Sequence, residues 1–118
     1  MIGVQEPTPA QIEFLIKKMK HLYDHHGIPQ HLTAQEHSGI FVRKDKFIVK
    51  ENGHIWINEA KVPYEKGFGT IKPRYFSYLV MEEVGRQNSL IMVVNTHLDH
   101  KVSIAKETGV RYILEAIQ

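Results

Sequence analysis

The sequence predicts one α/β domain over residues 1–118, with a mixed, mostly antiparallel central sheet that carries helices on both faces. Three observations lead to this fold class. A helix signal starts at Thr8, short stretches of β-forming residues fill the segment from Gly39 to Val62, and Leu90–Val94 is an unbroken apolar run. A run without alternation is typical of a strand covered on both faces, usually a parallel strand inside a sheet.

The first elements follow from local signals. Residues 1–4 predict a short strand. Thr8 and Gln11 have the spacing of a capping box, and Pro9 occupies the first helical position, where its missing N–H is harmless. Apolar residues then recur at helical spacing, so we expect a helix that ends or breaks near Gly27.

The middle of the chain changes from a helical to a strand-like period. Residues 30–37 are polar and predict an irregular connection. Asn52 and Gly53 form a strong hairpin signal, because a type I′ turn needs positive φ at both positions. We therefore expect a three-stranded antiparallel meander. Its segments are Gly39–Lys44, Lys46–Lys50 and His54–Val62.

The second half predicts a loop, two helices and two strands. Residues 63–72 form the loop, and Pro73 can open a helix that ends at Gly85 or Asn88. After the strand at 90–94, Thr96 and Asp99 have capping-box spacing for another helix, with Ala105 on its apolar face. Gly109 would end that helix, and the alternation over 110–116 predicts a last strand.

Composition narrows the range of functions. The chain has 42% apolar and 24% charged residues and no cysteine, which excludes disulfides, thiolate zinc sites and a cysteine nucleophile. We recognise no signal peptide and no apolar run near the roughly 18 residues that span a bilayer, so a cytoplasmic protein is expected. The net charge of +2 is too small to imply a nucleic-acid partner, although basic residues outnumber acidic ones eight to four from Arg43 to Arg74.

The predicted element order resembles the GCN5-related N-acetyltransferase (GNAT) fold, whose sheet opens between its fourth and fifth strands to admit acyl-coenzyme A. The segment Tyr64–Gly69 lies where that family has its pyrophosphate-binding signature, with glycines at 67 and 69 and Tyr64 in place of the usual Arg or Gln. Glycines let backbone N–H groups approach a phosphate. Asn95, followed further on by Gly109 and Val110, matches the ends of a second family motif.

This resemblance implies an N-acyltransferase that uses acetyl-CoA and an amine acceptor, either a small molecule or a protein. Glu59 is then the candidate base, since burial can raise a carboxyl pKa, and Tyr64 is a second candidate catalytic residue. Ala105 stands where the family's thiolate-protonating tyrosine is expected, so activity would be impaired or rely on another acid. The candidate cofactor-binding residues are Lys66, Gly67, Phe68, Gly69, Thr70 and Asn95.

Two alternatives remain open. The run Val94–Thr96 also resembles small acetyltransferase-like bacteriophage proteins, which would imply a degenerate fold acting as a virion component or binding a host protein, in the host cytoplasm or the virion. The eight histidines suggest a second alternative, a metal-dependent hydrolase. In it, His21 with His25, and His97 with His100, would form two pairs of metal ligands. A surface or helix-end role is the simpler interpretation of these histidines, and no metal ligand is assigned.

Overall fold

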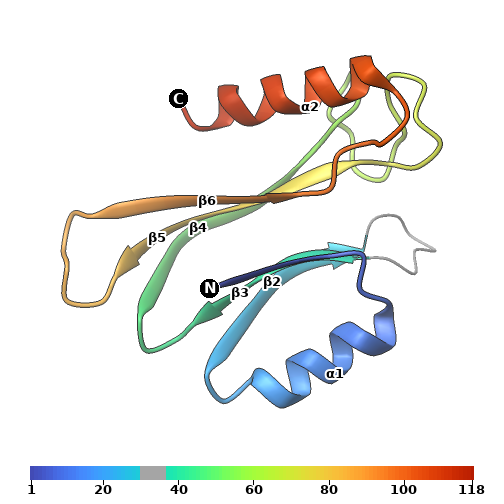
Figure 1. Cartoon of the computed structure of the whole chain (residues 1–118). Helices are drawn as coiled ribbons and strands as arrows, with labels where there is room; N and C mark the ends of the chain where they lie inside the picture. Colours follow the sequence, from blue (N-terminus) through green and yellow to red (C-terminus); the bar gives the residue numbers. More distant parts are fainter. Residues whose placement is uncertain (30–36) are drawn as a thin grey trace.

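The computed structural model describes residues 1–29 and 37–118, which fold into four layers in the order helix, sheet, sheet, helix (Figure 1). Helix α1 (Pro9–Met19) lies on the outside of the first sheet, and α2 (Ser103–Ala116) lies on the outside of the second. Neither helix is long and apolar enough to span a membrane. The α/β class is confirmed, but two stacked sheets replace the single central sheet that the sequence predicts.

Each sheet has three strands, and every pairing between the described strands is antiparallel. The first sheet has the order β1 (Ile2–Gln5), β3 (His37–Arg43), β2 (Tyr23–Pro29). The second has the order β4 (Phe47–Trp56), β5 (Tyr75–Glu83), β6 (Leu90–Thr96). The prediction of a mixed sheet in GNAT order is therefore wrong.

Two apolar cores hold the layers together. Between the sheets, Ile40 and Val42 of β3 pack against Leu79 and Met81 of β5, and all four are at most 1% exposed. On the other face of the second sheet, Ile57, which directly follows β4, packs with Phe76 of β5 and Tyr112 of α2. The second sheet is thus covered on both faces.

The N-terminal predictions are largely confirmed. The backbone N–H of Gln11 donates to Thr8 Oγ1 at 3.3 Å and that of Thr8 to Gln11 Oε1 at 2.8 Å, which completes the capping box. Helix α1 ends earlier than expected, because Tyr23 already belongs to β2. The predicted irregular connection lies outside the described residues, except for His37, which begins β3.

The hairpin predicted at Asn52 and Gly53 is wrong. Strand β4 continues through both residues, which pair with Leu79 and Tyr78 of β5. A Cβ atom on Gly53 would lie 2.8 Å from the Tyr78 ring, so this glycine permits a close approach between strands rather than a turn.

The helix predicted from Pro73 is also wrong, because Tyr75–Glu83 is strand β5. Tyr75 and Leu79 face the first sheet, while Phe76 lies in the core against α2. A strand that is buried on both faces carries a nearly continuous apolar run, which in β5 is interrupted between Tyr75 and Met81 at Ser77. Within such a run, some apolar residues are also three or four positions apart, so the segment resembles a helix although it is a strand.

At the C-terminal end, the strand predicted at Leu90–Val94 is confirmed as β6, although it is an antiparallel edge strand. The predicted helix end at Gly109 and the final strand are wrong, because α2 runs from Ser103 to Ala116 without a break. A Cβ atom on Gly109 would lie 2.6 Å from Leu98 Cδ2, so the glycine lets α2 approach the preceding loop.

Gly67, in the connection between β4 and β5, is the glycine whose substitution we expect to destabilise the fold most. A Cβ atom on Gly67 would lie 2.3 Å from Asn58 Cα and 2.7 Å from the Ile57 carbonyl oxygen, and backbone atoms cannot rotate away. We expect Gly67→Ala to lower the free energy of unfolding by about 3 kcal/mol, as severe overpacking does. Urea denaturation measures this loss.

Gly85→Ala is the matched control. Gly85 has a φ of +84° and open space around it, so only backbone strain of about 1 kcal/mol is expected there. Equal losses for the two variants would contradict the proposed contact at Gly67.

Candidate functional site

Strands β1 and β6 end side by side at one end of the sandwich, and Asn95 of β6 joins them. Its Nδ2 donates to the carbonyl oxygens of Val4 and Gly39, each at 2.9 Å, and its Oδ1 accepts from Nε2 of Gln5. Asn95 is only 7% exposed. One amide side chain therefore fixes β6 against β1 and β3 of the opposite sheet.

The residues that follow these two strands form an acid–base pair. Glu6 comes directly after β1 and has a φ of +59°, and His97 comes directly after β6. Oε1 of Glu6 lies 3.2 Å from Nδ1 of His97. With Nδ1–H donated to the carboxylate, the imidazole presents Nε2 as the free acid–base atom. Glu6 is exposed and His97 partly exposed, so a ligand can reach both.

Asp99, two residues after His97, forms a buried ion pair with Arg74. Arg74 Nε is 3.5 Å from Asp99 Oδ1, and both side chains are 5% exposed. The other oxygen of Asp99 accepts hydrogen bonds from the backbone N–H groups of Lys101, at 3.0 Å, and Val102, at 2.8 Å. The pair thereby holds the loop between β6 and α2 against the start of β5.

The pKa of Asp99 reflects these contacts. Burial alone would raise it, but the hydrogen bonds from Val102 and Lys101 and the charge of Arg74 outweigh burial and lower the pKa below its ordinary value. Asp99 is therefore an anion at neutral pH. It serves as a fixed countercharge to Arg74 and not as a proton donor.

A pocket of about 300 Å³ opens between the β4–β5 and β6–α2 loops, on the Arg74 side of the site. It is lined by Gly69, Ile71, Lys72, Arg74, Asp99, His100, Lys101 and Val102. Asp99 contributes the one carboxylate in this lining, and that carboxylate already faces Arg74 and two N–H groups. The pocket is therefore suited to an anion, and we call it the basic pocket.

Comparison with known proteins identifies the fold. No protein-family model and no curated protein matches the chain. An endonuclease/exonuclease/phosphatase from Bacteroides vulgatus matches 98% of the chain with a TM-score of 0.88 and 24% identity, over 44% of its own length. A family protein of the same description from Bacteroides thetaiotaomicron matches 98% with a TM-score of 0.85 and 28% identity, over 42% of its length.

A third structure carries a more specific name. The mannosyl-6-phosphatase of Bacteroides thetaiotaomicron VPI-5482 matches 98% of the chain with a TM-score of 0.84 and 28% identity, over 43% of its length. The chain thus spans less than half of each of these proteins. This chain has the fold of the part of these endonuclease/exonuclease/phosphatase proteins that it matches.

These matches overturn the GNAT resemblance and the acyltransferase function that was drawn from it. They give no support to a bacteriophage origin either. Acetyl-CoA as a cofactor depended on the same resemblance and remains an untested prediction.

The residues predicted for acyl transfer mostly stabilise the β4–β5 connection. The carboxylate of Glu59 accepts a hydrogen bond from the Phe68 N–H at 3.1 Å, and Tyr64 packs on Trp56 with ring centroids 4.7 Å apart. Thr70 Oγ1 donates to the Gly67 carbonyl oxygen at 2.9 Å. These contacts give the loop its shape.

Two other predicted residues lie near the candidate site. Gly69 lines the basic pocket, and Asn95 joins the strands that carry Glu6 and His97. Lys66 is exposed in the β4–β5 connection. Five of the six predicted cofactor residues, Lys66–Thr70, are thus consecutive in the β4–β5 connection, and the sixth, Asn95, lies on β6.

The histidine pairs do not meet. His25 packs on Phe41 with ring centroids 4.9 Å apart, while His97 pairs with Glu6 and His100 lines the pocket. Within residues 1–29 and 37–118, no three or more His, Cys, Asp or Glu residues form a group that could hold a metal ion. The metal site built from two histidine pairs is thus not found there.

Sequence reasoning missed Glu6 and Arg74. The available signal was position, because Glu6 and His97 each come directly after the last residue of a strand. Such positions are informative only when the two strand ends are known to meet, and that requires the sheet arrangement.

We expect Asn95→Ala to lower the free energy of unfolding by about 2 kcal/mol, because it leaves two buried carbonyl groups without their donor. Asn52→Ala is the control, since Asn52 is exposed on β4 and its loss should stay within about 0.5 kcal/mol. Chemical denaturation compares the two. A loss at Asn95 no larger than at Asn52 would refute the role of the cross-link.

The lowered pKa of Asp99 predicts a pH dependence. The folded protein favours the anion, so its contribution to stability is present above the unfolded pKa of about 4 and is lost as pH falls through the lower folded value. The stability difference between wild type and Asp99→Asn should therefore shrink on acidification below that value. Urea denaturation across this range measures it, with exposed Glu13→Gln as control; a difference that stays constant would contradict the assignment.

Proposed function

We propose that this chain takes part in the hydrolysis of phosphate esters, most plainly of a small phosphomonoester such as a sugar phosphate. The observation that carries the proposal is the loop between β6 and α2. This loop supplies His97, which pairs with Glu6. It also supplies His100 and Lys101, which line the basic pocket. An acid–base group and an anion pocket on one short loop are what attack on a phosphate ester requires.

His97 is the candidate general acid–base. Its Nε2 would take a proton from the attacking water or return one to the leaving alcohol, while Glu6 holds the ring through Nδ1. Positioned general acid–base groups typically contribute about 10²–10⁴-fold to rate. Arg74, fixed by Asp99, and Lys101 would hold the negative charge of the phosphate.

A magnesium ion is compatible with these residues. Mg²⁺ is commonly held by one or two carboxylates together with water and the phosphate of the substrate, so it does not need a complete protein cage. Glu6, exposed beside His97, is the carboxylate that fits this requirement. When bound, the ion would neutralise charge on the phosphate.

The names of the similar structures support the same chemistry. Two are described as endonuclease/exonuclease/phosphatase proteins and one as a mannosyl-6-phosphatase. The pocket of about 300 Å³ suits a small molecule better than a duplex. We therefore place a phosphomonoester before a nucleic-acid phosphodiester.

The test measures phosphate release from mannose 6-phosphate, and cleavage of bis(p-nitrophenyl) phosphate, with Mg²⁺ and with EDTA. We expect monoester hydrolysis that His97→Asn lowers by about 100-fold or more, because asparagine cannot transfer the proton. Glu6→Gln should have a comparable effect. His21→Asn is the control, since His21 is exposed in the turn between α1 and β2.

Binding gives an independent readout. Calorimetry should show that mannose 6-phosphate binds and that Lys101→Ala weakens binding while folding is unchanged. The proposal fails if the protein neither hydrolyses nor binds the monoester. Faster cleavage of the diester would show that the substrate is a phosphodiester and not a phosphomonoester. An equal loss of activity in His21→Asn would refute the role of His97.

A further inference from the structure

Two histidines lie in the space between the two sheets. His26 of β2 pairs with Ile40 of β3, and His54 of β4 pairs with Ser77 of β5. Residues that pair across antiparallel strands point to the same face of their sheet. Ile40 lies in the core between the sheets, as does Leu79, which comes two residues after Ser77 on the same face of β5. Both imidazoles therefore point inward, toward the opposite sheet.

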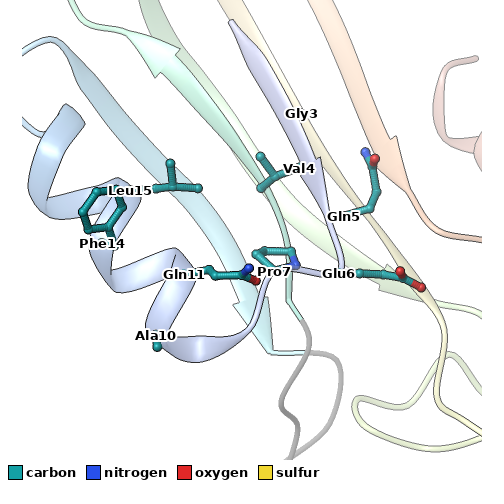
Figure 2. A pocket seen from close by; sticks show the side chains of 9 residues that line it. All are labelled: Gly3, Val4, Gln5, Glu6, Pro7, Ala10, Gln11, Phe14 and Leu15. Carbon is teal, nitrogen blue, oxygen red and sulfur yellow. The ribbon is translucent and has the colours of Figure 1, made fainter.

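Strands β2 and β4 lie opposite each other across this space. Asn95 joins β6 to β1, and Gln5 takes part in this link from the side of β1 that faces away from α1 (Figure 2). Since β1 and β6 are opposite each other, the strands at the other side of the two sheets, β2 and β4, are opposite each other too. Stacked sheets are about 10 Å apart, so side chains that point inward from facing strands come close to each other.

The polar contacts of the two rings are few. Nδ1 of His54 lies 3.0 Å from Ser77 Oγ, and the His54 ring meets the Tyr75 ring edge-on, with centroids 5.7 Å apart. Nε2 of His26 is buried and has no hydrogen-bond partner among residues 1–29 and 37–118. Hydroxyl groups and an aromatic ring therefore surround His54, and the inner nitrogen of His26 is left unsatisfied.

The pKa of His54 lies below its ordinary value for two reasons. Burial is the larger cause, because it disfavours the charged imidazolium, and the positive charge that His26 can carry acts in the same direction. The carboxylate on the same face of β2, Asp24, is exposed, and its Oδ1 lies 3.6 Å from Lys44 Nζ. In the described part of the chain neither His26 nor His54 forms an ion pair, so a proton on either ring has no countercharge.

We propose that His26 and His54 form a pH-sensitive joint between the two sheets. When both rings are neutral, they pack between β2 and β4, and the sandwich is closed on this side. Two imidazolium charges in the same dry space would repel each other, so protonation favours separation of the strands. The contribution of His54 to stability is thus complete above the unfolded pKa of about 6.5 and is lost as pH falls from there through the lower folded value.

Titration of the histidine ring signals by NMR tests the proposal. In the wild type, the His54 signal should change at a lower pH than the signal of His21, which is exposed in the turn between α1 and β2. In His26→Asn, the His54 signal should change at a higher pH than in the wild type, because the opposing charge is gone while burial remains. A His54 signal that changes together with that of His21, or that is unaffected by His26→Asn, would overturn the proposal.

Urea denaturation between about pH 7.5 and about pH 5.5 measures the consequence for the fold. The wild-type midpoint should fall with pH. It should fall less in His54→Asn, because asparagine can still form a hydrogen bond with Ser77 but gains no proton. His21→Asn is the matched control and should behave as the wild type does. Asp99 does not act in this range, since its contribution to stability is lost only below a pH of about 4.

The variants separate a joint from a general effect of acid. A fall that is as large in His54→Asn as in the wild type would overturn the proposal, as would a wild-type midpoint that does not change. An equally reduced fall in His21→Asn would overturn it too. If His54→Asn does not fold, the ring titration of the wild type and of His26→Asn decides the question.

Discussion

The alignment of β6 with β1, on which the candidate site is built, depends on the buried amide of Asn95. A buried asparagine is tolerated only when its polar atoms are satisfied, and here the partners are Val4, Gln5 and Gly39 of the opposite sheet. These bonds require β1 and β6 to end at the same level. Gly3 accommodates the contact, because a Cβ atom there would lie 3.0 Å from Asn95 Oδ1. Glu6 and His97 come within ion-pair distance as a consequence of this alignment.

The sequence predicts features that depend on neighbours along the chain. The capping box of α1, the strand at Leu90 and the loop at 63–72 all follow from local geometry, and all three are present. The α/β class follows from them. The arrangement in two sheets does not follow from local features, because none of them indicates which strand ends meet across a core. For the same reason Asn95 could be singled out as functional, while its partner residues could not.

The failures have two physical causes, which are burial of a strand on two sides and glycines that leave room for a neighbouring side chain. Strand β5 is covered by the first sheet and by α2, so its apolar residues lose the alternation that separates strands from helices. Gly53 and Gly109 look like turn and cap residues, but each instead leaves room for a side chain, Tyr78 and Leu98 respectively. The element order inferred from these positions was therefore wrong, and the GNAT resemblance was wrong with it.

The same geometry explains why stability and the candidate site cannot be separated at Asn95. Any change that lets β6 slide against β1 also moves His97 away from Glu6, since each follows directly after its strand.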